Sequence, residues 1–427
     1  MKRFLVTMLF GTFLSTVAKA QLYYDPAKIK SAYTIKDEKA TARTARIIAQ
    51  AESLNTIALP GNEDDKADLD AALWATSQFM VRTANSDAGV KRLMKHYAML
   101  GSGTQRSLLE LVYGLYPNDY TSDMESILKN GANIRIRSIA AAYLFRQNKN
   151  VDSKNRFKAS LAASGLAKAG DYADAFDLWA AQQLNETALP PLDSLLAWQA
   201  KHCFKVIYSF QRSNRDLQGL AVVQDSNGKL MRDSTGKLLS FVQLARSASN
   251  LPFFITNGST PQGLYAITGT GISRNVFIGP TPNLQTVMMG EVNPPVFTHY
   301  FPIVFNATPW NIYTSYFPEN WQEWPGMAES FMAGQLGRSE IIAHGTTIDP
   351  EWFKGSPYYP VSPTLGCLCG REIWDPVTGG IEKSDQLEMV NAFISTPGTK
   401  GYLMVINLPG GDNAVTREEL EKLLKAW

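Results

Sequence analysis

The sequence changes its pattern near Lys205, and this change constrains the fold more than any other feature. From about Asp37 to Glu186, apolar residues recur at three- and four-residue spacing, with breaks at Gly, Pro and Asn, which is typical of amphipathic helices. After Lys205, short apolar runs alternate with turn-forming residues. We therefore expect an α+β multidomain protein with an all-α helical domain over residues 21–204 and a β-rich domain over 205–427.

Several local signals make the helical half more specific. One apolar stripe should form a single helix that ends at Pro117-Asn118-Asp119, and it consists of Leu108, Leu111, Val112 and Leu115. The Ala-rich run from Ala159 to Ala169 predicts another helix, ended by Gly170-Asp171. A following helix should run through Ala175, Leu178 and Trp179. Pro190-Pro191 marks a helix break before a last helical stretch from Leu192.

In the second half, Asn227-Gly228 and Thr235-Gly236 predict tight turns between short strands. Gly, Pro, Asn, Thr and aromatic residues dominate from there to about Pro360, so we expect this stretch to be β-rich. The continuous apolar run from Tyr402 to Ile406 predicts a strand buried on both faces. Thr416, three residues before Glu419, predicts the capped start of a short final helix.

The N-terminus has the features of a secretory signal peptide over residues 1–20. Lys2 and Arg3 precede an apolar stretch from Phe4 to Val17, and Ala18-Lys19-Ala20 follows as a small-x-small cleavage site. Gln21, rather than cysteine, follows the site, so we expect no lipid anchor. We expect a mature chain without a membrane span, periplasmic or extracellular.

Charge and cysteine content exclude several classes of protein. The formal net charge is +2, and loss of Lys2, Arg3 and Lys19 with the signal leaves 38 basic against 39 acidic side chains, which argues against a nucleic-acid partner. Three cysteines in an exported chain do not make a disulfide framework. Cys367 and Cys369 are one residue apart, too close for an unstrained bridge, so at least one thiol should be free.

The motif most informative about chemistry combines a histidine with a cysteine. The segment 341–346, Ile-Ile-Ala-His-Gly-Thr, places His344 at the end of a predicted strand. After a loop rich in Pro and Tyr, the segment 364–369, Thr-Leu-Gly-Cys-Leu-Cys, presents Cys367 behind a glycine. A thiolate is the nucleophile of cysteine enzymes, and an imidazole can activate the thiol and later protonate a leaving amine. The pair therefore indicates acyl transfer.

These segments resemble the catalytic domain of the L,D-transpeptidase family, in which a His-Gly-Thr-like strand end is followed by a loop and a Ser/Thr-His-Gly-Cys motif. Two further segments resemble that domain: Thr260-Pro261-Gln262-Gly263-Leu264-Tyr265 is similar to its strand entry, and Pro397-Gly398-Thr399 before 402–405 to its final strand. The resemblance covers roughly residues 209–408. It implies an L,D-transpeptidase-like catalytic domain acting on peptidoglycan stem peptides through a cysteine acyl-enzyme.

The resemblance also implies roles for single residues. Cys367 would attack a peptide carbonyl, His344 would take up its proton, and the backbone carbonyl of Gly345 would orient the imidazole. Backbone N–H groups of Leu365, Gly366 and Cys367 would form the oxyanion hole. Further residues are candidates for substrate binding, namely Thr346, Thr364, Cys369, Arg371 and Tyr359. The reaction implies no cofactor and no metal, and the helical domain could recruit a protein partner.

Two departures from the family pattern leave alternatives open. Leu365 stands where the family usually has a second histidine, and Cys369 stands where it usually has Arg or Asn. A catalytically degenerate module that only binds cell-wall peptides is therefore an alternative, as is a cysteine hydrolase of another substrate. Within the family, transpeptidation and L,D-carboxypeptidation share one acyl-enzyme and are not separated by sequence.

Several residues near the motif have both a functional and a purely structural explanation. Cys369 could line the pocket or simply pack. Arg338 could present charge at the mouth of the site or form solvated surface. The aromatic residues between Trp310 and Trp324 could form a lid or a packed insertion. His299 is the one other histidine that we would test for proximity to the cleft.

Overall fold

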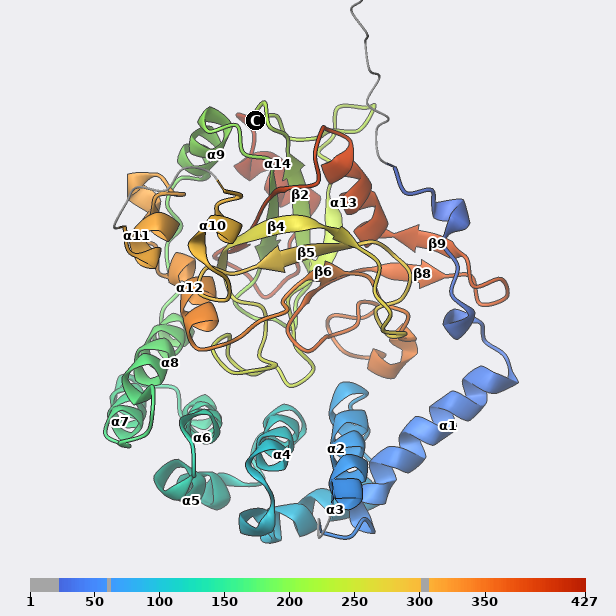
Figure 1. Ribbon diagram of the computed structural model, residues 1–427, viewed down its shortest axis with the longest axis vertical. Helices are drawn as coiled ribbons and strands as arrows, with labels where there is room; N and C mark the ends of the chain where they lie inside the picture. The colour runs from blue at the N-terminus through green and yellow to red at the C-terminus, as the bar shows by residue number, and fades with distance from the viewer. Residues whose placement is uncertain (1–22, 60–62, 301–306) are drawn as a thin grey trace, which may run out of the picture.

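The fold is a β-barrel resting on a curved layer of helices, as the computed structural model in Figure 1 shows. The structure describes residues 23–59, 63–300 and 307–427, with side chains described from residue 66 in the second range. The predicted signal segment 1–20 lies outside the described residues. The coarse prediction, mainly helix followed by a β-rich half, is confirmed. The boundary predicted between residues 204 and 205 falls between the last helix of the first half and the first strand.

The helical half contains nine α-helices in the described residues, which are α1 (Glu38–Glu52), α2 (Glu63–Gln78), α3 (Ala84–Lys95), α4 (Ser102–Leu115), α5 (Thr121–Asn130), α6 (Ile134–Gln147), α7 (Val151–Ala162), α8 (Ala169–Leu184) and α9 (Leu192–Lys201). Side-chain caps fix several starts: Asn133 Oδ1 accepts from Ile136 N at 3.0 Å, and Asn150 Oδ1 accepts from Ser153 N at 2.8 Å. Helices α2 to α8 follow one another along an arc below the barrel (Figure 1).

The helical predictions are right for α4 and wrong for the Ala-rich run. Helix α4 buries Leu108, Leu111 and Val112 and ends at Leu115, as the stripe predicts. The run from Ala159 to Ala169, by contrast, is broken between α7 and α8, where Gly165 and Lys168 both have positive φ angles, 69° and 59°. Gly170 lies inside α8. A glycine in the first turn costs a helix little, so composition alone misplaces this break.

The β-rich half is built around a closed barrel of eight strands in the order β1-β10-β4-β5-β6-β7-β3-β2. These strands are β1 (Val206–Gln211), β2 (Gly219–Gln224), β3 (Phe241–Leu244), β4 (Gly263–Gly271), β5 (Asn283–Val287), β6 (Ala343–His344), β7 (Leu368–Gly370) and β10 (Gly401–Asn407). A separate hairpin consists of β8 (Glu372–Trp374) and β9 (Ile381–Ser384). The buried strand predicted over 402–406 is confirmed as β10, which pairs with β1 in parallel and with β4 antiparallel.

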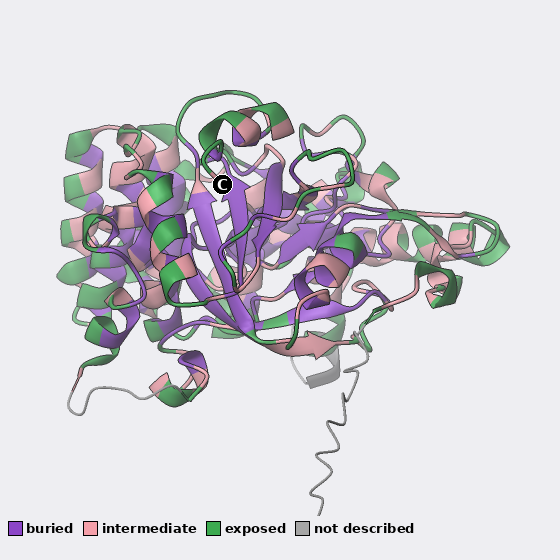
Figure 2. Cartoon of the chain, turned by 90° about the horizontal axis from the view of Figure 1, so that it is seen from above, coloured by how far each residue is buried: buried purple, intermediate pink, exposed green. Residues whose placement is uncertain are grey.

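Alternation along the strands divides the apolar side chains between two cores. Ile207, Leu403 and Val405 belong to the inner cluster, whereas Tyr208 and Met404 belong to a second cluster on the outer face. Helix α13 (Asp385–Ile394) fills the end of the barrel that lies away from the helical layer, and it contacts β2, β3, β5 and β7. Figure 2 accordingly shows the strands buried almost throughout, while the helices carry both buried and exposed residues.

The stretch expected to be β-rich up to Pro360 also contains three helices, α10 (Pro294–Phe297), α11 (Pro309–Thr314) and α12 (Ala328–Gln335). They pack on the outer face of β1, β4 and β10. Tyr313, Phe317 and Trp321 are fully buried in the outer cluster. The aromatic residues between Trp310 and Trp324 therefore form a packed insertion and not a lid.

The final helix, α14 (Arg417–Leu423), begins where predicted. Thr416 Oγ1 accepts from Glu419 N at 3.1 Å. The carboxylate of Glu419 does not complete a capping box, because it forms an ion pair with Arg212 at 2.6 Å. The turns predicted at Asn227-Gly228 and Thr235-Gly236 are confirmed, with φ angles of 82° at Gly228 and 81° at Gly236. None of the described helices combines the length and apolar character needed to cross a bilayer.

The end of the barrel that faces the helices carries the termini of all eight strands on one rim. Strands β1, β3, β5 and β10 finish there, and β2, β4, β6 and β7 begin there. The connection between β3 and β4, residues 245–262, reaches the helical layer. Within it, Asn257 Nδ2 donates to Glu110 Oε2 at 3.0 Å, and the ring of Phe254 lies 6.4 Å from those of Tyr172 and Trp179.

Replacing Phe254 by alanine should test how strongly the two halves are joined. Phe254 is fully buried between the barrel and α8, so removal of the ring should lower the free energy of unfolding by about 3–5 kcal/mol. Denaturant titration of the full chain measures this change. The matched control, Val377→Ala, alters a side chain that is 77% exposed and should change the free energy by less than about 0.5 kcal/mol. A loss below about 1 kcal/mol in Phe254→Ala would contradict a shared core.

Candidate active site around Cys367 and His344

The candidate site is built on the parallel pair of β6 and β7. Ala343 pairs with Leu368, His344 pairs with Cys369, and Leu368 N donates to Ile342 O at 3.0 Å. Ala343 and Leu368 belong to the inner core of the barrel. Because side chains alternate between faces along a strand, His344 and Cys369 point outward, and Cys367, two residues before Cys369, lies on their side. The sheet thus brings the two predicted catalytic residues to one face at the rim.

The Cys367 thiol is half-buried and forms hydrogen bonds with the backbone just before β6. Its Sγ accepts from Ile342 N at 3.5 Å and lies 3.4 Å from Glu340 O, to which the thiol donates. Burial raises the pKa of this thiol to about 11, while the Ile342 N–H and the positive charge of Arg338 act in the opposite direction. The thiol is therefore protonated at neutral pH.

The His344 imidazole is buried, with 5% of its surface exposed. Its Nδ1 forms a short hydrogen bond with the carbonyl oxygen of Gly345. This is the contact expected of that carbonyl, and its catalytic significance stays a prediction. Burial lowers the pKa of His344, an effect only partly opposed by the Gly345 carbonyl. The ring is accordingly neutral at pH 7, with the proton on Nδ1 and a lone pair on Nε2.

No hydrogen bond joins the thiol and the imidazole among the described residues. The thiol donates to Glu340 O and the ring is bonded through Nδ1. Nε2 of His344 has no partner in the described part of the chain. The resting thiol and imidazole are therefore both neutral, and they do not form a thiolate–imidazolium pair.

The loop before β7 is organised by the Thr364 hydroxyl. Its Oγ1 donates to Cys367 O at 2.8 Å and accepts from Gly366 N at 3.0 Å. Of the three N–H groups expected in the oxyanion hole, that of Gly366 is thus already engaged. The N–H groups of Leu365 and Cys367 have no acceptor within the described residues. The Leu365 side chain is 45% exposed.

Arg338 lies directly beneath this loop. The explanation of Arg338 as solvated surface is therefore wrong. Its side chain is almost fully buried and donates to three backbone carbonyls, those of Phe253, Ser259 at 3.0 Å and Gly258 at 2.8 Å. Burial lowers its pKa to about 10, which still leaves the guanidinium charged at neutral pH.

Gly366 is the point where the loop and Arg338 meet. It has a φ angle of 118°, and a Cβ there would collide with Arg338 Nη2 and lie 2.7 Å from Gly258 O. Glycine is therefore required before Cys367, because the Arg338 guanidinium packs against the loop at this position. The sequence carried no signal for this, because Arg338 is separated from the motif by the whole histidine segment.

A buried carboxylate holds the turn after His344. Glu372 Oε2 accepts from Thr346 N, and its Oε1 accepts from Ser384 Oγ, both at 2.7 Å. A Cβ on Gly345 would collide with this carboxylate. Burial raises the pKa of Glu372 to about 7. Thr346, predicted as a possible substrate contact, is thereby tied to Glu372 through its N–H and to Phe277 O through its hydroxyl, at 3.1 Å.

The remaining predicted substrate residues lie away from the thiol or are already bonded. Cys369 is fully buried in a small apolar cluster with Phe79 and Tyr358, as expected of a packing residue. Arg371 forms an ion pair with Asp385 at 2.7 Å, which directs its charge toward α13. Tyr359 OH donates to Glu351 Oε1 at 2.8 Å on the exposed loop. Neither Arg371 nor Tyr359 touches the Cys367 loop in this arrangement.

The segment 260–265 contacts the loop that carries Cys367 through a side-chain hydrogen bond. Thr260 Oγ1 donates to Gly366 O at 2.9 Å, so the first residue of the segment holds the loop that carries Cys367. His299 is elsewhere: its Nε2 contacts Gly401 O at 2.9 Å, at the start of β10 and the opposite end of the barrel. In the described residues, no group of three or more His, Cys, Asp or Glu side chains is placed to hold a metal ion.

Comparison of the chain with models of known protein families, with curated proteins and with solved structures finds no match in any of the three.

The rate at which iodoacetamide alkylates Cys367 should show that the thiol is protonated at neutral pH. With a pKa of about 11, the thiolate fraction, and hence the rate, should rise about tenfold per pH unit between pH 7 and 10. Mass spectrometry of peptides from the folded protein resolves the three cysteines. Exposed Cys203 serves as the reactive control and buried Cys369 should not react. A rate at Cys367 that levels off below pH 8 would reveal a preformed thiolate and contradict this assignment.

Proposed function

We propose that the protein is a cysteine acyltransferase of the L,D-transpeptidase type, which acts on the stem peptides of peptidoglycan. One observation carries the proposal: a half-buried thiol and a buried neutral imidazole with an unoccupied Nε2 share one face of adjacent parallel strands. The likeness of the sequence segments 260–265, 341–346, 364–368 and 397–405 to that family supports the choice of substrate. Export through residues 1–20 would place the enzyme beside the cell wall.

The first half-reaction begins with proton transfer from the thiol. Cys367 turns from Glu340 O toward His344, and Nε2 accepts the proton as the sulfur bonds to the substrate carbonyl carbon. The carbonyl oxygen becomes negatively charged and accepts from the N–H groups of Leu365 and Cys367. The imidazolium then gives its proton to the leaving amine, and the C–N bond breaks to leave a thioester.

The second half-reaction regenerates the thiol. An amine of a second stem, or water, attacks the thioester carbonyl while His344 takes its proton. The C–S bond breaks, and the thiolate recovers the proton from the imidazolium. Attack by an amine gives a cross-link, whereas attack by water gives an L,D-carboxypeptidase product. Both outcomes use the same residues, so the proposal covers both.

Arg338 supplies a positive charge at a site where Cys369 stands in place of the family's usual Arg or Asn. Its guanidinium lies under Gly366 and lowers the pKa of the Cys367 thiol. A fixed positive charge at this point stabilises the sulfur anion and the negative charge that develops on the substrate oxygen. The buried carbonyl contacts of Arg338 hold the charge in place without neutralising it, since no carboxylate of the described residues pairs with it within ion-pair distance.

A second candidate is a module that binds cell-wall peptides without turning them over. The exposed Leu365 in place of a histidine and the missing thiol–imidazole hydrogen bond favour it. Reaction with a carbapenem distinguishes the two candidates.

Incubation of the purified full chain with a carbapenem should produce a covalent adduct on Cys367. The thiol opens the β-lactam ring and forms a thioester, so the protein gains the whole mass of the drug. Mass spectrometry should place the adduct on Cys367 and on no other residue. Because His344 is the base, His344→Ala should slow adduct formation by about 100-fold or more.

The matched controls use the other thiol of the same segment. Cys367→Ala should give no adduct, whereas Cys369→Ala should react at a rate within a few-fold of the unchanged protein. A failure of the unchanged protein to react at any concentration would favour the binding module. An adduct that survives in Cys367→Ala would remove Cys367 as the nucleophile.

A further inference from the structure

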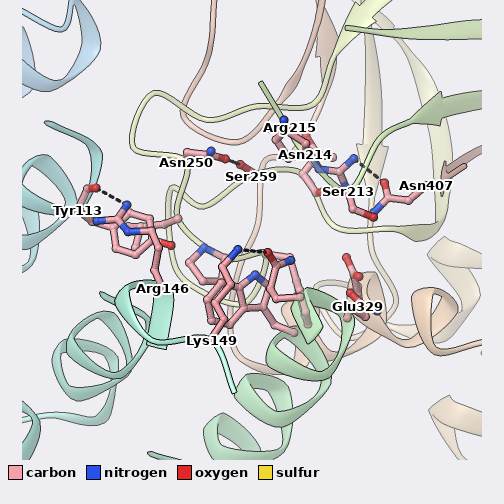
Figure 3. A pocket seen from close by; sticks show the side chains of 17 residues that line it. Tyr113, Arg146, Lys149, Ser213, Asn214, Arg215, Asn250, Ser259, Glu329 and Asn407 are labelled. Carbon is pink, nitrogen blue, oxygen red and sulfur yellow. Dashed lines mark hydrogen bonds between the residues drawn. The ribbon is translucent and has the colours of Figure 1, made fainter. Parts of the chain in front are cut away.

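A polar cavity of about 500 Å³ lies between the helical layer and the barrel rim. Figure 3 shows side chains entering it from both sides: Tyr113 of α4, Arg146 of α6 and Lys149 from the helices, and Arg215 and Asn407 from the barrel. Neither Cys367 nor His344 lines this cavity. It is therefore separate from the site described above.

The lining carries an excess of positive charge. Arg146, Lys149 and Arg215 are the cations of the lining, and Glu329 is its one carboxylate. The Glu329 carboxylate is held by Gln262, whose N and Nε2 donate to it at 2.8 and 2.6 Å. Burial raises the pKa of Glu329, an effect opposed by the positive charge of Arg215 and by the hydrogen bonds from Gln262.

None of the three cations forms an ion pair with a carboxylate among the described residues. Arg215 is almost fully buried and donates to Asn407 Oδ1 at 2.6 Å and Thr260 O at 3.0 Å. Lys149 Nζ donates to Gln183 Oε1 at 3.5 Å. All of these acceptors are uncharged. Glu329 acts electrostatically on Arg215 without forming an ion pair with it, so the lining keeps more positive than negative charge, and buried positive charge is costly without a paired counter-charge.

Arg146 shows most directly that positive charge in the lining has no paired carboxylate. Its Nη1 donates to Tyr113 O at 2.8 Å, and its guanidinium lies 4.0 Å from the centre of the Tyr113 ring. Its Nε and Nη2 are buried and have no acceptor. The ring and the carbonyl fix the guanidinium at the cavity wall and leave its charge unpaired.

Carboxamides and hydroxyls supply the rest of the polar lining, at Gln182, Gln183, Ser213, Asn214, Asn250 and Ser259. Such groups both donate to and accept from peptide groups. A volume of this order suits a small ligand rather than a folded partner. We propose that this cavity binds a short acidic peptide, with its carboxylates against Arg146, Lys149 and Arg215 and its peptide groups against the carboxamides.

One residue connects this cavity to the Cys367 loop. The Thr260 carbonyl accepts from Arg215 at the cavity, and the Thr260 hydroxyl donates to Gly366 O of the loop. A peptide bound against Arg215 therefore rests on the same segment that holds the nucleophile. The binding site is nevertheless independent of the thiol, and it would exist in the acyltransferase and in the non-catalytic module alike.

Isothermal titration calorimetry of the full-length Cys367→Ala variant with triglutamate tests the proposal without any reaction at the thiol. We expect saturable binding, weakened at least tenfold by Arg146→Gln and by Lys149→Gln. Lys149 makes one long hydrogen bond from an exposed position, so its variant should fold even where Arg146→Gln does not. The matched control is Arg156→Gln on α7, which removes an exposed charge outside the cavity and should leave the affinity unchanged.

Two further ligands separate a peptide site from a simple anion site. Triglutamine should bind at least tenfold more weakly than triglutamate, because it lacks the side-chain carboxylates. Inorganic phosphate should also bind more weakly, because one small ion cannot contact the three cations and the carboxamides of a cavity of about 500 Å³ at once. Equal affinity for phosphate would overturn the peptide assignment. Absence of triglutamate binding at millimolar concentration, or binding unchanged in both cavity variants, would overturn the site itself.

Discussion

The parallel pairing of β6 with β7 is the contact on which the candidate site depends. Two short strands, joined by the Ala343–Leu368 and His344–Cys369 pairs, close the barrel between β5 and β3. The same register turns Ala343 and Leu368 into the core, so alternation presents His344 and Cys367 on the outer side. The strand pairing that closes the barrel therefore also places His344 and Cys367 on the same face. A shift of one residue would bury the thiol and separate it from the imidazole.

Charge buried at the rim shapes the loops around this pair. Arg338 draws together the carbonyls of Phe253, Gly258 and Ser259 and packs beneath Gly366, while Glu372 holds the backbone after His344 from the other side. Each makes a glycine necessary at the point of contact. Thr260 links this region to the cavity that faces the helices. There its carbonyl accepts from Arg215, which also donates to the Asn407 carboxamide. The helical layer thus completes a surface that the barrel rim begins.

The sequence predicted well those features that depend on local pattern. Period-3.6 spacing gave α4, an apolar run gave β10, and Thr416 gave the start of α14, because each is decided within a few residues. It failed at the Ala-rich run, where two positive φ angles break the helix and no strong breaker marks the place except Gly165. It also missed α10 to α12, because a buried insertion rich in aromatic residues has the composition of strands.

At the site, the motif identified residues but not their partners. The neighbours of Cys367 and His344 along the chain could be assigned, whereas Arg338 and Glu372 act through long-range packing that no local pattern reports. The Gly366 N–H was expected to be free, and only the folded loop shows that Thr364 engages it. For the same reason the sequence makes Arg371 a candidate substrate contact, and only the fold shows that it pairs with Asp385.

The proposal that His344 is a neutral base that acts on the Cys367 thiol through Nε2 is tested most directly by ¹⁵N NMR of the protein labelled in its four histidines. At pH 7 the His344 signals should be those of a neutral ring protonated at Nδ1, with Nε2 unprotonated. The Nε2 signal should move in Cys367→Ala and stay in place in Cys369→Ala. A ring protonated on both nitrogens at pH 7, or an Nε2 signal unaffected by loss of Cys367, would contradict the proposed pair.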